Sequence, residues 1–301
     1  MDQTEYHLRL TQGYCQEGRL SRILYLGVKE GLTYISPYVE QQFYGQDSEI
    51  LIISSSCFNS REVKNVISEY ICDLIVIVMD IDTIEKIKVA HDIIGVSRIH
   101  QYVKTDINFD AILDNMSTRE RKRFIRSHKD GFSYDISYSN EDFFYFYDKM
   151  HAPTMTKRYG EKARSLPRQD AYETLFKKGI LFRIFKNGKW VAGSVGQIDT
   201  LHKKMNSRLI GVLDGDYRYR ADGSQNFVYH SILEWSCHEK FIDIVDFQGC
   251  EPFLTKGTFQ YKKRFGTEAC IPDNVFKELR LLLRVPNENS SAYKFIINNP
   301  L

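Results

Sequence analysis

One stretch of the sequence joins charged residues to the expected start of a helix. "RADGSQ", residues 220–225, precedes a strongly apolar segment of residues 227–235. A helix start exposes unpaired backbone N–H groups and the positive end of the helix dipole, and a glycine lets an anion approach the backbone closely. Guanidinium groups can bind phosphate oxygens. The segment predicts a phosphate site or else a plain turn, and the candidate residues are Arg218, Arg220, Gly223, Ser224 and Gln225.

Three carboxylates near the ends of expected strands are candidates for proton transfer. Asp214 and Asp216 follow the apolar segment of residues 209–213, and Glu251 follows the segment of residues 242–249. An amine that attacks an activated ester or thioester must lose a proton, which a carboxylate can accept directly or through water. Glu251 could also bind the amine as an ammonium ion. The alternative for Asp214 is a structural turn, because Asp-Gly is a common turn pair.

The stretch "GTFQYKKRFGTE", residues 257–268, places three consecutive cations between two aromatic residues. Successive residues of a helix do not share a face, so Lys262 and its neighbours Lys263 and Arg264 cannot all point at one ligand. The sequence leaves two interpretations open here. The segment is either a solvated helix face or a place that holds an anion with one of its cations.

A basic helix is expected at residues 117–131, with Ser117 or Thr118 as its cap and Gly131 at its end. Residues 119–129 carry six Lys or Arg against one acid. Arg119, Arg123 and Arg126 are spaced so that they share one helix face. This helix is either an exposed linker or a face that binds phosphate.

The elements around these residues predict two domains. Residues 1–115 alternate short buried strands, at 22–28, 49–54 and 73–81, with helical segments at 60–72 and 83–95, which is typical of a small α/β domain with some parallel strands. Residues 116–301 continue with the basic helix, an aromatic helix at 141–150 and a hairpin at 180–199 around an Asn-Gly turn. A strand, a helix and a further strand follow.

Charge is distributed unevenly between these two parts. Residues 1–115 hold 10 Lys and Arg against 17 Asp and Glu, whereas residues 116–301 hold 31 against 22. Chance drift of surface charge can produce such a difference. The alternative is that the second part faces an anion such as a phosphorylated cofactor or RNA.

Metal sites and membrane spans are not expected from the sequence. The six cysteines form no C-x-x-C pair, and the eight histidines show no H-x-x-x-H spacing. The longest apolar run, Leu74 to Met79, is far shorter than the roughly 20 residues that span a bilayer. We therefore expect a cytoplasmic protein with reduced thiols, no metal and no membrane span, and its oligomeric state stays open.

Residues 112–275 resemble a GNAT-type fold of the kind found in FemABX-like acyltransferases. "MSTRERKRFIRSHKDGFSYDIS" is similar to the basic helix and first strand of those proteins, and "LFRIFKNGKWVAGSVGQI" to their central hairpin. "EPFLTKGTFQYKKRFGTE" resembles their closing signature of a glycine, an aromatic-lysine pair and Phe-Gly. The sequence departs from the usual loop Q/R-x-x-G-x-G/A of GNAT acetyltransferases, because Gln225 stands at its last position.

The resemblance implies an α/β protein with a GNAT-like domain of mixed, largely antiparallel sheet and a smaller α/β N-terminal domain. It also implies an N-acyltransferase that moves an acyl group from an acyl-CoA-type thioester to an amine of a sugar or peptide. Backbone N–H groups of residues 209–213 would polarise the carbonyl, Lys262 would steady the oxyanion, and Tyr261 would stack on an adenine or a ribose.

Two other functions are compatible with this resemblance. The first is a FemABX-like aminoacyltransferase, whose donor is aminoacyl-tRNA and whose basic helix at residues 119–126 would contact the tRNA. The second is a GNAT-like binding module without catalysis. The incomplete "RADGSQ" loop favours the binding module, whereas the presence of Lys262 and Arg220 favours an enzyme.

Overall fold

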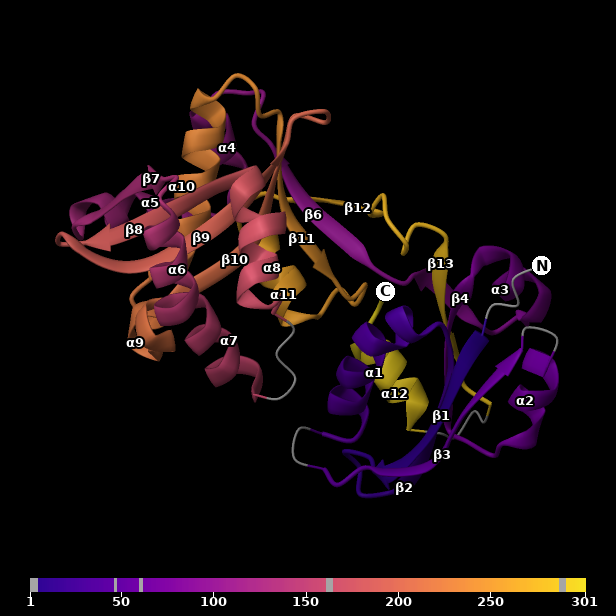
Figure 1. The fold of residues 1–301 in the computed structure, drawn as a ribbon. Helices are drawn as coiled ribbons and strands as arrows, with labels where there is room; N and C mark the ends of the chain where they lie inside the picture. Colours follow the sequence, from indigo (N-terminus) through magenta and orange to yellow (C-terminus); the bar gives the residue numbers. More distant parts are fainter. Residues whose placement is uncertain (1–4, 46–47, 60–61, 161–164, 287–290) are drawn as a thin grey trace. The chain divides into compact units, whose positions relative to one another are not determined.

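The computed structural model describes residues 5–45, 48–59, 62–160, 165–286 and 291–301 (Figure 1). Contacts divide the chain into two units. Unit 1 comprises Met1–Ile99, Gly249–Gln260 and Cys270–Leu301, and unit 2 comprises His100–Gln248 and Tyr261–Ala269. The boundary expected near residue 115 differs from this division, because strand β6 (Ile99–Lys104) falls almost wholly in unit 2 and the C-terminal segment returns to unit 1. The unequal charge persists, with 14 Lys and Arg against 18 Asp and Glu in unit 1 and 27 against 21 in unit 2.

Unit 1 is built on a six-stranded sheet in the order β3-β1-β2-β4-β13-β5. Its strands are β1 (Glu5–Tyr14), β2 (Leu20–Gly27), β3 (Leu51–Asn59), β4 (Leu74–Asp80), β5 (Ile93–Val96) and β13 (Leu279–Arg284). Its helices are α1 (Lys29–Phe43), α2 (Val63–Glu69), α3 (Ile81–Ile87) and α12 (Ala292–Asn298). Strands β2 and β4 are parallel, as the alternating pattern predicts, and β4 is buried from Leu74 to Met79 because both of its neighbours and both sheet faces are covered.

One expected helix of unit 1 is shorter in the structure. The sequence pattern predicts a helix over residues 83–95, but α3 ends at Ile87 and residues 93–96 form the edge strand β5. β5 pairs with β13, which comes from the far end of the chain, with Ile93 opposite Leu283. Local periodicity cannot reveal a partner that lies so far away in sequence.

Unit 2 contains a seven-stranded sheet in the order β12-β6-β11-β10-β9-β8-β7. Besides β6, its strands are β7 (Phe132–Ser137), β8 (Gly179–Lys186), β9 (Lys189–Asp199), β10 (Lys204–Val212), β11 (Ile244–Cys250) and β12 (Glu268–Cys270). Strands β7 to β10 are antiparallel and β10 pairs with β11 in parallel. The sheet is therefore mixed and largely antiparallel, as expected. The Asn-Gly hairpin is confirmed, since Asn187 and Gly188 connect β8 to β9 with φ of 51° and 78°.

Helices and single turns pack around this second sheet. They are α4 (Phe109–Asn115), α5 (Thr118–Lys129), α6 (Asn140–Phe146), the π-helical turn η2 (Tyr147–His151), α7 (Ala152–Tyr159), α8 (Arg168–Thr174), η4 (Phe176–Lys178), η5 (Leu213–Gly215), α9 (Tyr217–Ala221), α10 (Ser224–His238) and α11 (Gly257–Lys263). α5 is the expected basic helix, capped by the side chain of Ser117. No helix in the described ranges has both the length and the apolar character that crossing a bilayer requires.

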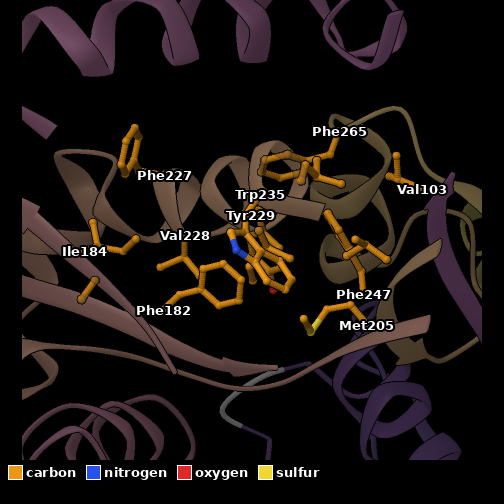
Figure 2. Close-up of a cluster of buried hydrophobic side chains, with 14 of the residues drawn as sticks. Val103, Phe182, Ile184, Met205, Phe227, Val228, Tyr229, Trp235, Phe247 and Phe265 are labelled. Atoms are coloured by element: carbon orange, nitrogen blue, oxygen red, sulfur yellow. The ribbon is translucent and has the colours of Figure 1, made fainter. Parts of the chain in front are cut away.

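Helix α10 is almost entirely buried against the sheet of unit 2. Val228 and Trp235 of this helix lie on the side of Phe182 and Met205 of the strands, and Phe227 lies on the other side of the helix (Figure 2). A helix that is apolar on most of its faces is stable only inside a core. Burial thus fixes the position of the start of α10, which follows the "RADGSQ" segment directly.

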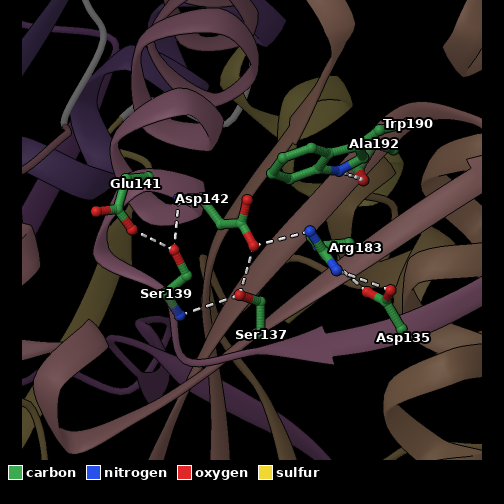
Figure 3. Close-up of polar contacts among 8 residues, drawn as sticks. All are labelled: Asp135, Ser137, Ser139, Glu141, Asp142, Arg183, Trp190 and Ala192. Carbon is green, nitrogen blue, oxygen red and sulfur yellow. Dashed lines mark hydrogen bonds and ion pairs between the residues drawn. The ribbon is translucent and has the colours of Figure 1, made fainter.

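A polar network fixes the start of α6 on the same sheet. Arg183 of β8 forms a bidentate pair with Asp135 of β7, through Nε at 2.7 Å and Nη2 at 2.8 Å, and its Nη1 donates to Asp142 at 2.8 Å (Figure 3). Ser137 also donates to Asp142, and Ser139 caps the helix. Because α6 continues directly into η2 and α7, this network also positions the residues that follow it.

Candidate active site

The parallel strands β10 and β11 stop pairing early. Their register comprises three pairs, which end at Asn206 opposite Asp246, although β10 runs on to Val212 and β11 to Cys250. β10 also has an irregularity between Ser207 and Leu209 in its pairing with β9. A strand that loses its neighbour must satisfy its backbone groups in another way. The point where these strands split is therefore where side chains or a ligand can bind the backbone.

Side chains from η2 and α7 bond the backbone of β10 beyond the split. His151 Nδ1 lies 3.0 Å from the carbonyl oxygen of Ile210, and Thr154 Oγ1 accepts a hydrogen bond from the backbone N–H of Val212 at 3.0 Å. Gly211 permits this approach, because a Cβ there would lie 2.5 Å from the backbone nitrogen of His151. Gly211 therefore allows η2 to pack closely on β10. It does not cause the irregularity of the strand, which lies between Ser207 and Leu209.

His151 is a buried imidazole, and one of its two ring nitrogens has no hydrogen-bond partner among the described residues. A carbonyl oxygen can only accept, so Nδ1 carries the proton and Nε2 keeps its lone pair. The side chain is 3% exposed, and Nε2 has no hydrogen-bond partner among the described residues. Burial lowers the pKa of His151 below its ordinary value, against the opposing effect of the Ile210 carbonyl. At neutral pH the ring is uncharged and able to accept a proton, and it sits in a π-helical turn, a feature frequent at functional sites.

The sequence prediction missed His151, although one signal of its position is present. Pro153 falls inside the helical pattern that begins near residue 140, and a proline there interrupts the regular i to i−4 hydrogen bonds. The structure has η2 and the start of α7 at this point. A histidine beside such an interruption is a better candidate than one inside a regular helix.

Gln248 of β11 faces the split from the other strand and holds Lys262. The ammonium of Lys262 donates to the backbone carbonyl of Gln248 at 2.5 Å, and the side chain is 5% exposed. Gln248 has a φ of 66° and bonds β10 through Arg208 Nη1 at 3.0 Å and Asn206 Oδ1 at 3.3 Å. The predicted oxyanion group, Lys262, is thus bound to the backbone of β11 in this structure. Lys263 and Arg264 are exposed, as the helical interpretation predicts.

Tyr261 is half-buried, and its ring packs against the core of unit 2. Its ring meets those of Tyr229 and Phe265 at 5.8 and 5.5 Å between centroids. The phenol oxygen is buried and has no hydrogen-bond partner among the described residues. Burial raises the pKa of Tyr261 well above its usual range, so the phenol stays protonated. The charge of Arg158 acts on the pKa of both Tyr229 and Tyr261, which places the end of α7 near these phenols.

The start of α10 is occupied by a carboxylate of its own chain. Asp222 Oδ1 accepts hydrogen bonds from the backbone N–H of Ser224 at 3.0 Å and from its hydroxyl at 2.7 Å. Gly223 adopts a φ of 100°, as the loop requires, and Arg220 Nε donates to Gln225 at 3.2 Å. Ser224 is fully buried. The predicted phosphate position at the first amide of this helix is therefore taken by Asp222.

The candidate carboxylates have local structural partners or lie in a turn. Asp216 caps α9 and pairs with Arg218 Nη2 at 2.6 Å, and this hydrogen bond lowers the pKa of Asp216 to about 2. Asp214 is exposed in a turn with a φ of 53°, which fits the turn alternative. Glu251 lies in unit 1, where Lys256 Nζ approaches it to 3.3 Å. A carboxylate with a pKa near 2 is a weak base at neutral pH.

Two cavities lined by cations flank α9 in unit 2. The first is about 540 Å³ in volume, and its lining residues are Thr154, Lys157, Arg158, Gly215, Asp216, Tyr217, Arg218 and Arg220. The second is about 920 Å³, and its lining residues are Thr118, Arg119, Lys122, Arg123, Arg126, Ser127, Asp130, Ala221 and Asp222. The expectation that Arg119, Arg123 and Arg126 share one face is confirmed. Both cavities carry an excess of positive charge and can attract phosphate groups.

A buried acid anchors the second of these cavities. Glu120 is fully buried, and its carboxylate accepts from Arg123 Nη1 at 2.9 Å and from Asn226 Nδ2 at 2.8 Å. His230 of α10 approaches the same carboxylate to 3.2 Å. The acid therefore ties α5 to α10 and fixes the guanidinium of Arg123 at the cavity wall.

Comparison with known proteins finds similarity in solved structures only. No protein family matches the chain, and no curated protein matches it by sequence. FemX is similar with a TM-score of 0.47 and 10% identity, over 92% of this chain and 88% of that one. L-PGS from Bacillus licheniformis has a TM-score of 0.42 and 9% identity, over 95% of this chain and 87% of that one. A GCN5-related N-acetyltransferase from Sphaerobacter thermophilus has a TM-score of 0.39 and 11% identity, over 89% of this chain and 76% of that one. The similar structures thus include both groups that the sequence resembles.

Proposed function

We propose that unit 2 is an N-acyltransferase that moves an acyl group from an acyl-CoA-type thioester to an amine of a sugar or peptide. The observation that supports it best is the early split of β10 and β11 beside a buried, uncharged His151. A strand backbone without a neighbouring strand offers N–H groups for a carbonyl, and a free imidazole lone pair offers a base. Acyl transfer to an amine needs both.

The chemistry assigns a separate task to each side of the split. The amine nitrogen attacks the thioester carbonyl carbon and loses a proton to His151 Nε2, and the carbon–sulfur bond breaks. The protonated phenol of Tyr261 supplies a proton to the leaving thiolate. The backbone N–H of Ile210 polarises the carbonyl, because backbone groups alternate along a strand so that those of Leu209 and Gly211 face β9, and Val212 already donates to Thr154. Lys262 is a positioning residue that acts through Gln248.

The carrier of the acyl group is bound by the cavity beside α9 and α7. Lys157, Arg158 and Arg220 line it, together with the Asp216–Arg218 pair. Three cations without a carboxylate partner in the described part of the chain match the phosphates of a CoA-type carrier better than the start of α10 does, since Asp222 occupies that position.

The test is an assay of thiol release from acyl-CoA with a panel of amino sugars and peptide amines. We expect turnover with at least one pair and a rise in melting temperature with CoA at low salt. Lys157→Gln should raise KM for the acyl-CoA, whereas Lys149→Gln, a cation of the same segment outside the cavity, should not. Absence of both turnover and stabilisation with every acyl-CoA would overturn the CoA donor.

A second candidate function is a transferase that uses aminoacyl-tRNA. The specific observation in its favour is the larger cavity along α5, whose cations Arg119, Lys122 and Arg126 are exposed. Such a surface suits a backbone with many phosphates, and each neutralised phosphate makes affinity fall more steeply with salt.

The matched variants for this second candidate lie on one helix. Arg119→Gln with Lys122→Gln should weaken binding to charged tRNA and flatten its salt dependence. Arg121→Gln is the control, because Arg121 lies on α5 outside the cavity and pairs with Asp114 at 2.7 Å. An equal loss of tRNA affinity in the double variant and in the control would exclude the cavity as the tRNA-binding surface. A protein that responds to neither donor would instead be a binding module.

A further inference from the structure

Three side chains with metal-binding atoms gather on the edge of the sheet of unit 1. Glu5 and His7 lie on β1, and Cys57 lies on the edge strand β3. His7 and Cys57 stand directly opposite each other in the antiparallel register. Glu5 is two residues before His7, and because side chains alternate along a strand, the two share a face. One ligand atom from each of the three lies within 4.8 Å of the others.

The separation of the sulfur and nitrogen atoms matches that of ligands around zinc. Cys57 Sγ lies 3.5 Å from His7 Nδ1. Ligand bonds of about 2.3 Å to sulfur and about 2.1 Å to nitrogen, at a tetrahedral angle, put these two atoms about 3.6 Å apart. A thiolate, an imidazole and a carboxylate are also the three donor types that Zn²⁺ takes in proteins. The strand register thus holds two donors at the required spacing without any rearrangement of the backbone.

We propose that Glu5, His7 and Cys57 form a zinc site that clips β3 to β1, with water in the remaining coordination position. Access supports it. Glu5 and Cys57 are exposed and His7 is half-buried, so an ion from solvent can reach all three ligand atoms.

The site also accounts for a feature of the sheet edge. β3 is an edge strand, and Leu51, Ile52 and Ile53 are about half exposed on it. Edge strands of this kind pair readily with other chains unless they are held or covered. A metal that joins Cys57 to His7 holds the opposite end of β3 to the sheet. The linear spacing of the histidines and cysteines did not predict it, because the donors come from strands 50 residues apart that are adjacent only in the fold.

Zinc titration of the chelator-treated protein tests the proposal. Calorimetry should show one Zn²⁺ per chain, and Co²⁺ should give a thiolate-to-cobalt absorption band in the near ultraviolet. Cys57→Ser and His7→Ala should each weaken Zn²⁺ binding at least about tenfold, and Glu5→Gln less. Cys270→Ser is the control, because Cys270 is exposed but lies on β12. Unchanged affinity in Cys57→Ser and His7→Ala, or no binding by the unaltered protein at 100 μM Zn²⁺ (about 5.5 kcal/mol), would overturn the site.

A second measurement uses the unaltered protein, so its result does not depend on whether the variants fold. The rate at which iodoacetamide alkylates Cys57, followed by peptide mass spectrometry, should fall at least about tenfold when Zn²⁺ is added, because the bound thiolate is no longer free to react. The rate at Cys270 should not change. Equal rates at Cys57 with and without Zn²⁺ would show that the sulfur and imidazole share only a hydrogen bond, and that outcome would overturn the proposal.

Discussion

Each of the two units contains a pair of parallel strands, β2 with β4 and β10 with β11, and these two pairs differ in how far they run together. In unit 1, β2 and β4 keep register through five residue pairs, from Ile23 opposite Leu74 to Gly27 opposite Val78. In unit 2, β10 and β11 keep register through three pairs and then continue apart. The first pair lies inside a core, whereas beyond the second pair the backbone of β10 is bonded by side chains of η2 and α7.

The glycines of the two pairs show what fills the space beside each strand. At Gly27 a Cβ would lie 2.0 Å from the carbonyl oxygen of Val78, so the two strands approach each other closely. At Gly211 the close neighbour is the backbone of Met150 and His151, which comes from a different element. A strand pair that splits needs a third segment to bond its backbone, and in unit 2 that segment brings a histidine to the sheet.

Replacing His151 by Asn should have the largest effect and tests whether the split is catalytic. The Asn amide can still donate to the Ile210 carbonyl, but it removes the base. General-base catalysis contributes about 10²–10⁴-fold, so kcat should fall by that factor, or about 2.7–5.4 kcal/mol. His202→Asn is the control, since His202 is exposed and pairs with Asp199. An unchanged kcat would show that unit 2 uses its split strands for packing only.

The same histidine predicts a direction for the pH profile. Burial lowers the pKa of His151 below about 6.5, and only the uncharged ring can accept a proton. Activity should therefore be constant above that pH and fall as the pH drops through the lowered pKa. The acidic limb should disappear in His151→Asn. A limb that persists in the variant would belong to another group.

Replacing Gly27 or Gly211 by alanine should lower the free energy of unfolding by different amounts in the two strand pairs. Gly27→Ala adds a backbone clash at a φ of 144° and should cost about 3 kcal/mol or more. Gly211→Ala should cost about 2 kcal/mol and also lower kcat, because it displaces His151. Gly257→Ala is the control, since no atom lies within 4 Å of its added Cβ.

Hydrogen exchange locates these losses. Gly27→Ala should reduce protection in peptides of β2 and β4, and Gly211→Ala in peptides of β10 and α7, because local stability follows local contacts. If Gly211→Ala left both kcat and the exchange of α7 unchanged, η2 would not depend on the strand as described.

Removing the hydroxyl of Thr154 should lower the free energy of unfolding by less than Gly27→Ala does. It leaves the imidazole of His151 in place. Thr154→Val keeps the shape of the side chain but leaves the N–H of Val212 without its acceptor at 3.0 Å. A buried donor left unpaired costs about 1–3 kcal/mol, which urea unfolding measures. Thr174→Val is the matched control, because the Thr174 hydroxyl bonds its own helix at an exposed position. Equal loss in the two variants would mean that Val212 finds another acceptor.

Elements that depend on local sequence were predictable. The Asn187–Gly188 hairpin follows from the positive φ that both residues tolerate, and α5 follows from the Ser117 cap and the spacing of its arginines. These features need only neighbours within a few residues. The loop before α10 was located for the same reason, with Gly223 at a positive φ.

Features that depend on distant partners were not predictable. The observed division of the chain differs from the boundary expected near residue 115, because β13 inserts between β4 and β5 from the end of the chain. The hydrogen bond of Lys262 could not be read from the sequence, because its partner, the carbonyl of Gln248, is a backbone atom on another element. His151 was missed because its surroundings come from β10, about 60 residues later. Burial and hydrogen bonding at each of these positions are properties of the fold.

The smallest expected effect on stability comes from two tyrosines whose hydroxyl groups differ in their hydrogen-bond partners. In unit 1 the Tyr38 hydroxyl is buried and donates to Asn299 Oδ1 at 2.7 Å, whereas in unit 2 the Tyr261 hydroxyl has no partner among the described residues. Tyr38→Phe should cost about 1 kcal/mol in urea unfolding, because a buried hydrogen bond is lost. Tyr261→Phe should change stability by less than about 0.5 kcal/mol, or raise it, because it removes a polar group that burial leaves unpaired.

Activity then decides why unit 2 keeps that hydroxyl. A buried polar group without a partner calls for an explanation, and a catalytic role is one that activity can test. If the phenol protonates the leaving thiolate, Tyr261→Phe should lower turnover of acyl-CoA while stability stays level, and thioesters with a more acidic thiol should recover part of the loss. If Tyr261→Phe destabilised the protein as much as Tyr38→Phe does, the Tyr261 hydroxyl would have a hydrogen-bond partner in solution. The two units would then differ in the pairing of their parallel strands and not in this hydroxyl.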